Sequence, residues 1–354
     1  KKRQLVQKIL LNSLYGVLGL PAFRFYDVDN ATAVTTTGQT VIKSTADMAN
    51  IKYNKELGDS TLDSNIYIDT DSVFFSAVPL LDKRIPNWKD NEQDTIAGYV
   101  NDIAEEMQDY LNGFYDILSK KVFNVDKDKH RFEIKKEYVS KSGIWIAKKR
   151  YAQWIISDNG VAVDKLDVKG LDVVRSSYPA AFRKFMSEVL IDILKGNTEN
   201  ELTDKIWGFK KGLSEMNVVQ IAKNTSVKNL TKYLPKGKQQ RMFQFKLGTP
   251  AHVKAAIAFN QLLSHFKCEM KYEPMKNGDK VKWVYLKQNP MGLDGVAFKG
   301  YDDPKEIMEL VNTYIDYDKI FERELLKKLE DFYNAMDWGE VLSSTKTAEK
   351  FFSF

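Results

Sequence analysis

Two short runs of β-prone residues around a small polar tetrapeptide constrain the fold more than any other feature of this sequence. The runs cover residues 65–68 and 73–78, and Asp69-Thr70-Asp71-Ser72 lies between them. Small polar residues favour tight turns, so the pattern predicts an antiparallel β-hairpin with an acidic tip. Helical spacing of apolar residues over 94–122 predicts a helix that packs on this sheet. We therefore expect an α+β fold.

The rest of the chain divides into two parts of different character. Helices are predicted over 1–18 and 31–57, and strands within 131–157, where aromatic and β-branched residues alternate. Beyond residue 178 the pattern becomes mainly helical. The elements expected there are helices over 180–194, 198–216, 253–266 and about 303–336, with a short sheet over 280–288. This organisation predicts an α+β domain to about residue 178 and a mostly helical domain after it.

Composition limits the classes of function and of metal site. The 354 residues include 53 basic and 48 acidic side chains, a formal net charge of +5, which permits a nucleic-acid partner without demanding one. The lone Cys268 and three widely spaced histidines cannot form a zinc site of the usual kind. We expect any catalytic metal to bind oxygen ligands, as magnesium and manganese do. No apolar run could cross a bilayer, so we expect a soluble, intracellular protein.

The acidic tip leaves two interpretations open. A carboxylate pair on a rigid turn can hold a divalent cation against phosphate oxygens, as two-metal phosphoryl-transfer sites require. The alternative is an ordinary turn, because Asp, Thr and Ser favour hairpin tips for their own conformational reasons. The four residues alone do not decide between these interpretations.

The opening helix carries a second group of candidate residues. Lys8, Asn12 and Tyr15 are spaced i, i+4 and i+7, so they share one helical face. A lysine ammonium can meet a triphosphate, and a tyrosine ring can lie against a base or a sugar. Gly16 and Gly19 would let another surface approach closely. An amphipathic packing helix is the alternative for each residue taken singly.

Three motifs in order give the sequence a family resemblance. Residues 8–16 fit K-x-x-x-N-S-x-Y-G, residues 67–72 fit Y-x-D-T-D-S, and residues 148–151 fit K-K-R-Y. With this order and spacing, the chain resembles the C-terminal part of the B-family DNA polymerases, most of all those of T-even-like bacteriophages. The resemblance covers essentially the whole chain and is strongest up to about residue 178. One departure is Ile68, where phage relatives usually have glycine.

The resemblance implies roles for the residues in the first two motifs. Asp71 resembles the palm carboxylate that binds two magnesium ions, for which manganese can substitute, and Asp69 resembles its less directly engaged neighbour. Lys8 resembles the fingers lysine that reaches the incoming nucleotide, with Asn12 near it. Tyr15 and Gly16 resemble the floor under the nascent base pair.

It also implies how the chain holds DNA. The four motif residues Lys148, Lys149, Arg150 and Tyr151 resemble those that hold the primer strand near its 3′ end. Glu137 is expected to be an auxiliary acidic residue near the site. The basic loop 236–241 could follow duplex phosphates, although a solvated run of charge is the ordinary alternative.

A domain division follows from the same resemblance. We expect a remnant of the fingers helix over 1–20, the palm over 21–178, the thumb over 179–342 and a tail over 343–354. The tail residues Phe351, Phe352 and Phe354 are expected to engage a sliding clamp, as a similar aromatic tail does in phage polymerases. Packing of the tail on its own thumb is the alternative.

One expected part of the active site has no counterpart in these residues. In the family, a second carboxylate comes from an upstream motif, D-x-x-S-L-Y-P, which nothing here matches. We therefore expect a C-terminal fragment or subunit of a template-directed DNA polymerase, incomplete alone. Its expected partners are primer–template DNA, dNTPs, a sliding clamp and an upstream half with the other carboxylate and an exonuclease, in the cytoplasm and without a membrane. A non-catalytic DNA-binding and clamp-tethering module is the alternative.

Overall fold

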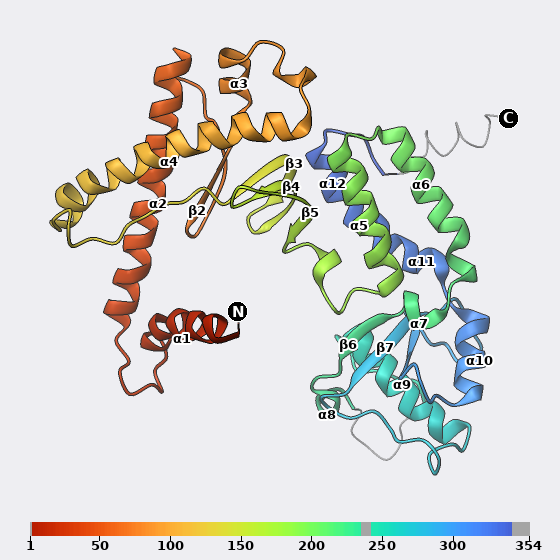
Figure 1. The fold of residues 1–354 in the computed structure, drawn as a ribbon. Helices are drawn as coiled ribbons and strands as arrows, with labels where there is room; N and C mark the ends of the chain where they lie inside the picture. Colours follow the sequence, from red (N-terminus) through yellow and green to blue (C-terminus); the bar gives the residue numbers. More distant parts are fainter. Residues whose placement is uncertain (1, 235–241, 342–354) are drawn as a thin grey trace. The chain divides into compact units, whose positions relative to one another are not determined.

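The computed structural model of the protein describes residues 2–234 and 242–341 (Figure 1). The chain forms two compact units. One comprises Lys1–Lys141 and Ile155–Lys165, and the other comprises Ser142–Trp154 and Leu166–Phe354. Helices are combined with small antiparallel sheets in each unit, so the α+β class is confirmed.

The first unit begins with two helices and a hairpin. Its elements are α1 (Lys2–Leu18), α2 (Val28–Leu57), β1 (Asn65–Asp69), β2 (Ser72–Phe75), α3 (Val78–Arg84), a 3-10 turn (Trp88–Asp90) and α4 (Gln93–Phe123). Asp27 caps the start of α2, where its carboxylate accepts a hydrogen bond from the Asn30 amide at 3.0 Å. Gly58 ends this helix with a φ of 74°, which glycine adopts without steric cost. The three predicted helices and the predicted hairpin are confirmed.

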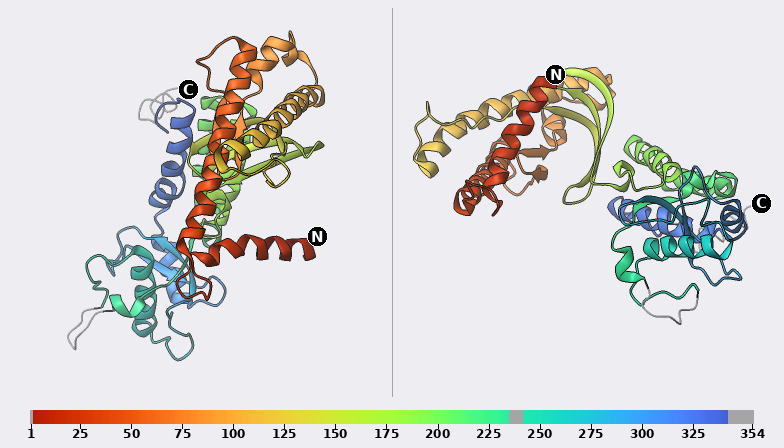
Figure 2. Two further views of the ribbon diagram at one scale, coloured as in Figure 1. Left: turned by 90° about the vertical axis from the view of Figure 1, so that its left-hand side faces the viewer. Right: turned by 90° about the horizontal axis from the view of Figure 1, so that it is seen from below.

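The core of the first unit lies among α2, α3 and α4, and α4 crosses α2 (Figure 1; Figure 2). Tyr53 and Leu81 are 1% exposed and Met107 is 2% exposed. Full burial of side chains such as Leu and Met contributes about 1.5–3 kcal/mol each. The guanidinium of Arg84 pairs with Glu56 of α2 at 2.6 Å and with Glu106 of α4 at 2.8 Å. These contacts fix the two long helices of this unit to each other.

Three strands form a sheet in the order β3–β4–β5, namely β3 (Tyr138–Ala147), β4 (Arg150–Asp158) and β5 (Val161–Lys169). Both β3 and β4 fall within the region where strands were predicted, whereas β5 was not predicted. The chain leaves the first unit within β3, returns to it within β4 and leaves it again within β5. Each strand therefore belongs partly to both units.

Residues 131–137 form no strand and bond to a helix, so the prediction of a strand there is wrong. The Ile134 amide donates to Asn112 Oδ1 at 2.9 Å, and its carbonyl accepts from Asn112 Nδ2 at 3.0 Å. The Lys136 amide donates to Gln108 Oε1 at 2.9 Å. Side-chain amides on α4 thus satisfy the backbone groups that a neighbouring strand would otherwise have paired.

The second unit contains shorter helices, 3-10 turns and a sheet. Its elements are a 3-10 turn (Asp172–Val174), α5 (Ala180–Lys195), α6 (Glu199–Gly212), a 3-10 turn (Leu213–Glu215), α7 (Val218–Ile221), β6 (Lys223–Ser226), α8 (Leu230–Tyr233), α9 (Ala251–His265), β7 (Lys280–Tyr285), β8 (Gly295–Phe298), α10 (Lys305–Tyr314), α11 (Tyr317–Phe321), a π-helical turn (Glu322–Leu326) and α12 (Lys327–Ala335). Thr198 and Glu201 form a capping box at the start of α6. The helices predicted over 180–194, 198–216 and 253–266 are confirmed, the second with a 3-10 ending.

An antiparallel sheet in the order β6–β7–β8, the third sheet of the described chain, supports this unit. Helix α9 packs on β8, where Phe259 of the helix and Val296 and Phe298 of the strand are all 0% exposed. The short sheet predicted over 280–288 is therefore present, as the central strand of three. This core fixes α9 and the strands as one body.

The helical stretch predicted over about 303–336 is confirmed, but the helix is interrupted after α10. Ile315 forms an isolated β-bridge with Leu286, and the Asp316 amide donates to the Tyr285 carbonyl at 2.9 Å. The Asp316 carboxylate then caps α11 by accepting from the Lys319 amide at 3.0 Å. Backbone pairing with residues 285–286, far away in sequence, ends the helix.

Candidate active site

The β1–β2 hairpin brings two predicted site residues together at its tip. Asp69 pairs with Ser72 as the last residues of the ladder, which leaves Thr70 and Asp71 as the turn. Thr70 has a φ of 51°, and the Asp71 amide donates to the Asp69 carbonyl at 2.5 Å. The Ser72 hydroxyl donates to the same carbonyl at 3.0 Å. The small polar residues thus form a tight turn that carries one carboxylate on each side of Thr70.

The two carboxylates have different surroundings. Asp69 is half-buried and accepts a hydrogen bond from the Thr70 hydroxyl at 3.0 Å, whereas Asp71 is exposed. In the described ranges, no group donates a hydrogen bond to the Asp71 carboxylate. Residues 2–234 and 242–341 contain no cluster of three or more His, Cys, Asp or Glu side chains that could hold a metal ion. The tip therefore presents two carboxylates, one half-buried and one exposed.

The base of the hairpin is anchored on α2. The Tyr53 hydroxyl donates to the Ser76 carbonyl at 3.0 Å, and its ring meets Phe75 edge-on at 5.5 Å. Burial raises the pKa of Tyr53 above its ordinary value of 10.0, so this hydroxyl keeps its proton and stays a donor. The anchor fixes the hairpin on the helical core and leaves its acidic tip exposed.

The candidate nucleotide-binding residues lie on α1. Lys8, Asn12 and Tyr15 are all exposed, and Tyr15 is 49% exposed. A Cβ added at Gly16 would meet nothing within 4 Å, so no atom of the described chain requires glycine there. Every described residue of α1 up to Gly16 is exposed, including six large aliphatic side chains: Leu5, Val6, Ile9, Leu10, Leu11 and Leu14. Helices with so many exposed aliphatic side chains usually pack against another protein segment or a partner.

The K-K-R-Y residues lie where β3 passes into β4: Lys148 and Lys149 form the turn, and Arg150 and Tyr151 begin β4. Lys148 and Lys149 are exposed, and Lys149 has a left-handed backbone with a φ of 61°. Arg150 pairs with Asp331 of α12 at 2.7 Å. Tyr151 is only 6% exposed, and its ring stacks on Trp145 at 6.2 Å. The two lysines thus face solvent, whereas the tyrosine belongs to the packed sheet.

Glu137, the candidate auxiliary residue, lies just before β3 in the first unit and is exposed. Its carbonyl accepts a hydrogen bond from the Asn159 amide at 2.7 Å. The clamp residues Phe351, Phe352 and Phe354 and the basic loop 236–241 lie outside the described residues. The division into fingers, palm, thumb and tail stays a prediction.

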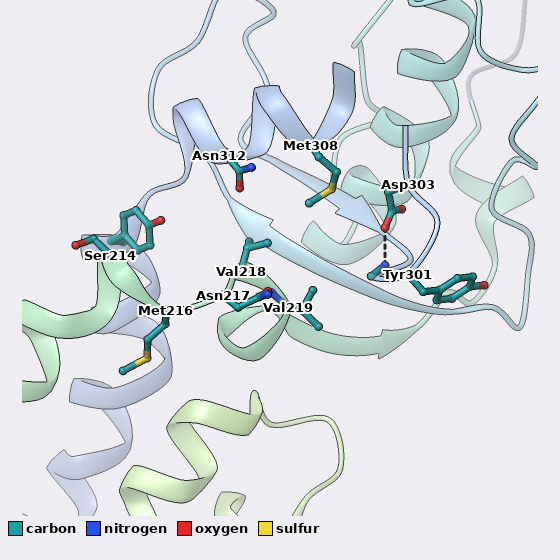
Figure 3. A pocket seen from close by; sticks show the side chains of 11 residues that line it. Ser214, Met216, Asn217, Val218, Val219, Tyr301, Asp303, Met308 and Asn312 are labelled. Carbon is teal, nitrogen blue, oxygen red and sulfur yellow. Dashed lines mark hydrogen bonds between the residues drawn. The ribbon is translucent and has the colours of Figure 1, made fainter. Parts of the chain in front are cut away.

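A cavity of about 630 Å³ lies in the second unit and does not contain the candidate carboxylates (Figure 3). Asp303 is the only acidic residue in its lining. This carboxylate accepts hydrogen bonds from the Lys299 and Gly300 amides, both at 2.6 Å. It serves to close a backbone turn, so the cavity does not compete with the hairpin tip as a metal site.

Comparison with known proteins decides the family. The model of DNA polymerase family B matches residues 1–82 and 106–336. This chain belongs to DNA polymerase family B. The matched residues include the hairpin tip, helix α1 and the K-K-R-Y turn, so the resemblance drawn from the three motifs is confirmed.

Relatives of this B-family chain include two phage DNA polymerases. It is 29% identical over 356 residues to the DNA-directed DNA polymerase of Enterobacteria phage T4, a match that covers 96% of this chain and 38% of the phage protein. It is 28% identical over 346 residues to that of Escherichia phage RB69, covering 94% and 37%. Identity to the mouse DNA polymerase alpha catalytic subunit is 26% over 318 residues, covering 89% and 18%. The chain therefore spans about 38% of the T4 relative's length.

Other findings bear on the B-family chain as a whole. No helix in its described part is long and apolar enough to span a bilayer. Gly170 and Asp331, which contact the K-K-R-Y turn, were not predicted as site residues. A glycine directly after a strand was a usable signal for Gly170, because such positions often need a positive φ. No sequence pattern pointed to Asp331, because it lies 181 positions after Arg150 in the chain.

Proposed function

We propose that this chain is the C-terminal part of a template-directed DNA polymerase that transfers nucleotides from dNTPs to a primer 3′-hydroxyl in DNA replication. The observation that carries the proposal is the accessible Asp69–Asp71 tip within the residues matched to the family. The motif order along the chain supports it, because nucleotide-binding, metal-binding and primer-binding candidates all occur in one B-family match.

Two Mg²⁺ ions are the cofactors we propose, with Mn²⁺ able to substitute. The donor set fits, because carboxylate oxygens are the ligands these ions prefer, and Asp71 is exposed at a tight turn. Asp71 would hold both ions and Asp69 would assist. When bound, the ions activate the primer hydroxyl and stabilise the leaving oxygens of pyrophosphate.

The chain's own residues position the reactants. Thr70 and Ser72 shape the turn, since the Thr70 hydroxyl bonds the Asp69 carboxylate and the Ser72 hydroxyl bonds the Asp69 carbonyl. Lys8 places a positive charge where the triphosphate binds, with Asn12 one turn further along the same face of α1.

The base pair and the primer strand are held by two further groups of side chains. The Tyr15 ring and Gly16 form the floor under the new base pair. Lys148 and Lys149 contact primer phosphates from the turn between β3 and β4, with Arg150, Tyr151 and Glu137 near them. Phosphate contacts of this kind position the primer without reading its sequence.

A further polypeptide part completes the enzyme in this proposal. The exposed aliphatic side chains of α1 support it, because such a surface in water favours association. The two-carboxylate tip supports it as well, since an upstream part would bring the remaining metal ligand and the exonuclease. Whether that part is joined to this chain or separate does not alter the chemistry.

Two finer elements of the proposal rest on the sequence. We propose that Phe351, Phe352 and Phe354 of the tail engage a sliding clamp, since three aromatics in four residues favour docking. We propose a cytoplasmic setting, where DNA and dNTPs are available.

Primer extension tests the proposal. The chain is combined with the upstream part of a T-even-like polymerase, supplied joined or separate, and dNTP incorporation into a labelled primer–template is measured with Mg²⁺. We expect Asp71→Ala to reduce extension by at least about a hundredfold. The matched control is Asp102→Ala, which removes an exposed carboxylate on α4 and is expected to retain the wild-type rate. Wild-type extension by Asp71→Ala would contradict the ligand assignment.

A non-catalytic DNA-binding and clamp-tethering module is the alternative, favoured by the absence of a three-ligand cluster in the described ranges. The same assay separates the two functions. A module binds primer–template equally with and without dNTP and never extends it, whatever partner is added. A half-enzyme gains extension and dNTP-dependent binding when the upstream part is present.

A further inference from the structure

Helix α2 holds the β1 side of the acidic hairpin through two asparagine contacts. The Asn50 Oδ1 accepts a hydrogen bond from the Ser64 amide at 3.0 Å, and its Nδ2 donates to Asp63 Oδ1 at 2.7 Å. Asn65, the first residue of β1, donates from its side-chain amide to the Ala46 carbonyl of α2 at 3.0 Å. Both contacts are at the end of β1 that lies away from the acidic tip.

The pairing of β1 with β2 shifts by one residue beside this anchor. Asn65 lies opposite Phe75, whereas Tyr67 lies opposite Phe74, so two steps along β1 match one step along β2. The extra residue is Ile66, which forms a β-bulge. A bulge redirects the side chains that precede it relative to those that follow it.

The bulge turns Asn65 toward α2. Phe75, its partner on β2, meets the Tyr53 ring of α2 at 5.5 Å, so this face of the hairpin lies on the helix. Side chains alternate along β2, so Ser72 and its partner Asp69 lie on the other face. In a regular strand Asn65 would share the face of Asp69 and would point away from α2. The bulge therefore lets one strand present an anchor to the helix and a carboxylate to the opposite face.

The same helix holds the β2 side of the hairpin. The Tyr53 hydroxyl donates to the Ser76 carbonyl at 3.0 Å, and the Ser76 amide donates to the Ser64 carbonyl at 3.0 Å. Ser64 is the residue whose amide Asn50 accepts, so the contacts of the two strands meet at the base of the hairpin. Since the turn at the tip is only two residues long, the direction of the tip is set by these contacts at its base.

We propose that Asn50 and Asn65 are positioning residues for the metal-binding carboxylates Asp69 and Asp71. This inference rests on the proposed function, and it gives a role to two residues that lie outside the three motifs. Each acts through the backbone of the β1 strand. A metal site requires its ligands to be held within about 0.5 Å of the productive geometry, so a hairpin loosened from α2 would bind Mg²⁺ more weakly.

The Mg²⁺ dependence of primer extension separates positioning from simple support of the fold. A variant that only lowers the fraction of folded enzyme reduces the rate by the same factor at every Mg²⁺ concentration. A variant that misplaces the carboxylates raises the Mg²⁺ concentration needed for half-maximal extension, because its site binds the ions more weakly.

The experiment measures primer extension by the chain with its upstream part over a series of Mg²⁺ concentrations, with thermal melts to verify folding. We expect Asn65→Ala and Asn50→Asp each to raise the half-maximal Mg²⁺ concentration by about tenfold. Asn50→Asp sets two carboxylates against each other. The double variant Asn50→Asp/Asp63→Asn restores the bond with donor and acceptor exchanged, so it should return close to the wild-type Mg²⁺ dependence.

Asn260 on α9 provides a matched control in the second unit. Its Oδ1 accepts from the Met275 amide at 2.7 Å, and its Nδ2 donates to the Met275 carbonyl at 3.0 Å. This is the same kind of support by a helical asparagine for a neighbouring backbone. Asn260→Ala should therefore lower the melting temperature and leave the half-maximal Mg²⁺ concentration unchanged.

Wild-type Mg²⁺ dependence in both Asn65→Ala and Asn50→Asp would overturn the inference, as would a double variant that behaves like Asn50→Asp. If Asn65→Ala does not fold, the exchange between Asn50 and Asp63 decides alone. If the wild-type assembly extends no primer, the proposed function fails instead. Amide hydrogen exchange in the isolated chain then tests the inference: residues 69–72 must exchange faster in Asn50→Asp and recover in the double variant, and unchanged exchange contradicts it.

Discussion

Lys223 and Glu324 form an ion pair of 2.8 Å, although the Glu324 side chain is 3% exposed and that of Lys223 is 35% exposed. Glu324 lies in the π-helical turn between α11 and α12, and Lys223 begins β6. Glu324 Oε1 receives no well-aligned hydrogen bond from the described groups, so the contact is electrostatic in character. The pair connects the helical part of the second unit to its sheet.

Removal of Lys223 should destabilise the chain. Lys223→Met leaves the Glu324 carboxylate buried without its counter-charge, and we expect a loss of about 1–3 kcal/mol, less than for a fully buried pair because Lys223 is partly solvated. The double variant Lys223→Met/Glu324→Gln should lose less than Lys223→Met alone. Thermal unfolding of wild type, Lys223→Met and the double variant measures this order of stability. A double variant that is less stable than Lys223→Met would contradict this account.

Glu56 should contribute to stability at neutral pH and lose that contribution in acid. The Arg84 guanidinium bonded to Glu56 holds the pKa of this carboxyl below its ordinary value of 4.5. As the pH falls through 4.5, Glu56 therefore takes up a proton in the unfolded chain before it does so in the folded chain. The stabilising contribution of ionised Glu56 is lost as the pH falls toward its pKa in the folded chain. Glu56→Gln should lower the melting temperature at pH 7, and the difference from wild type should shrink as the pH falls below 4.5. Exposed Glu309→Gln is the control, with no such pH-dependent difference expected.

His252 should make the chain less stable in mild acid. Burial lowers the pKa of His252 below its ordinary value of 6.5, and the positive charge of Lys223 lowers it further. Below pH 6.5, the unfolded chain therefore binds a proton at His252 more readily than the folded chain does. The contribution of neutral His252 to folding stability is complete above pH 6.5 and is lost as the pH falls. We expect a smaller fall in melting temperature between about pH 7 and 5 for His252→Gln than for wild type. A variant at the exposed His265, His265→Gln, should keep the wild-type dependence.

The aliphatic side chains of α1 should matter for assembly and not for the chain's own fold. Leu10 is 66% exposed, so Leu10→Gln should change the stability of the isolated chain by no more than about 0.5 kcal/mol. Leu81→Ala, in the core, should cost about 2–5 kcal/mol. Co-purification with the upstream part should be weakened by Leu10→Gln. Equal recovery of the variant and wild type would show that α1 is not the contact surface.

Much of the fold was predictable because its signals are local. The hairpin, α2 and α4 follow from turn residues and helical periodicity within single segments, and the structure places them accordingly. Residues 131–137 were misjudged because their alternation matches a strand, while the partners of Ile134 and Lys136 are amide side chains on α4. The break after Tyr314 was missed for a similar reason, since it depends on residues 285–286.

The candidate site was predictable in part. The Asp69–Asp71 tip could be located from the sequence because both residues belong to one turn. The different exposures of Lys149 and Tyr151 could not, because alternation along β4 does not say which face is covered by Trp145 and its neighbours. Nor could the sequence reveal that Arg150 has a carboxylate partner on α12.

The three strands that pass between the units limit how this protein can be dissected. The chain changes unit after residues 141, 154 and 165, so no single cut yields both units intact. A fragment that ends at residue 178 would keep β3, β4 and β5 but lose α5 and α12, which cover part of their unit's core. The two units are thus poor candidates for separate expression, and exchange of the second unit between relatives would require three junctions in place of one.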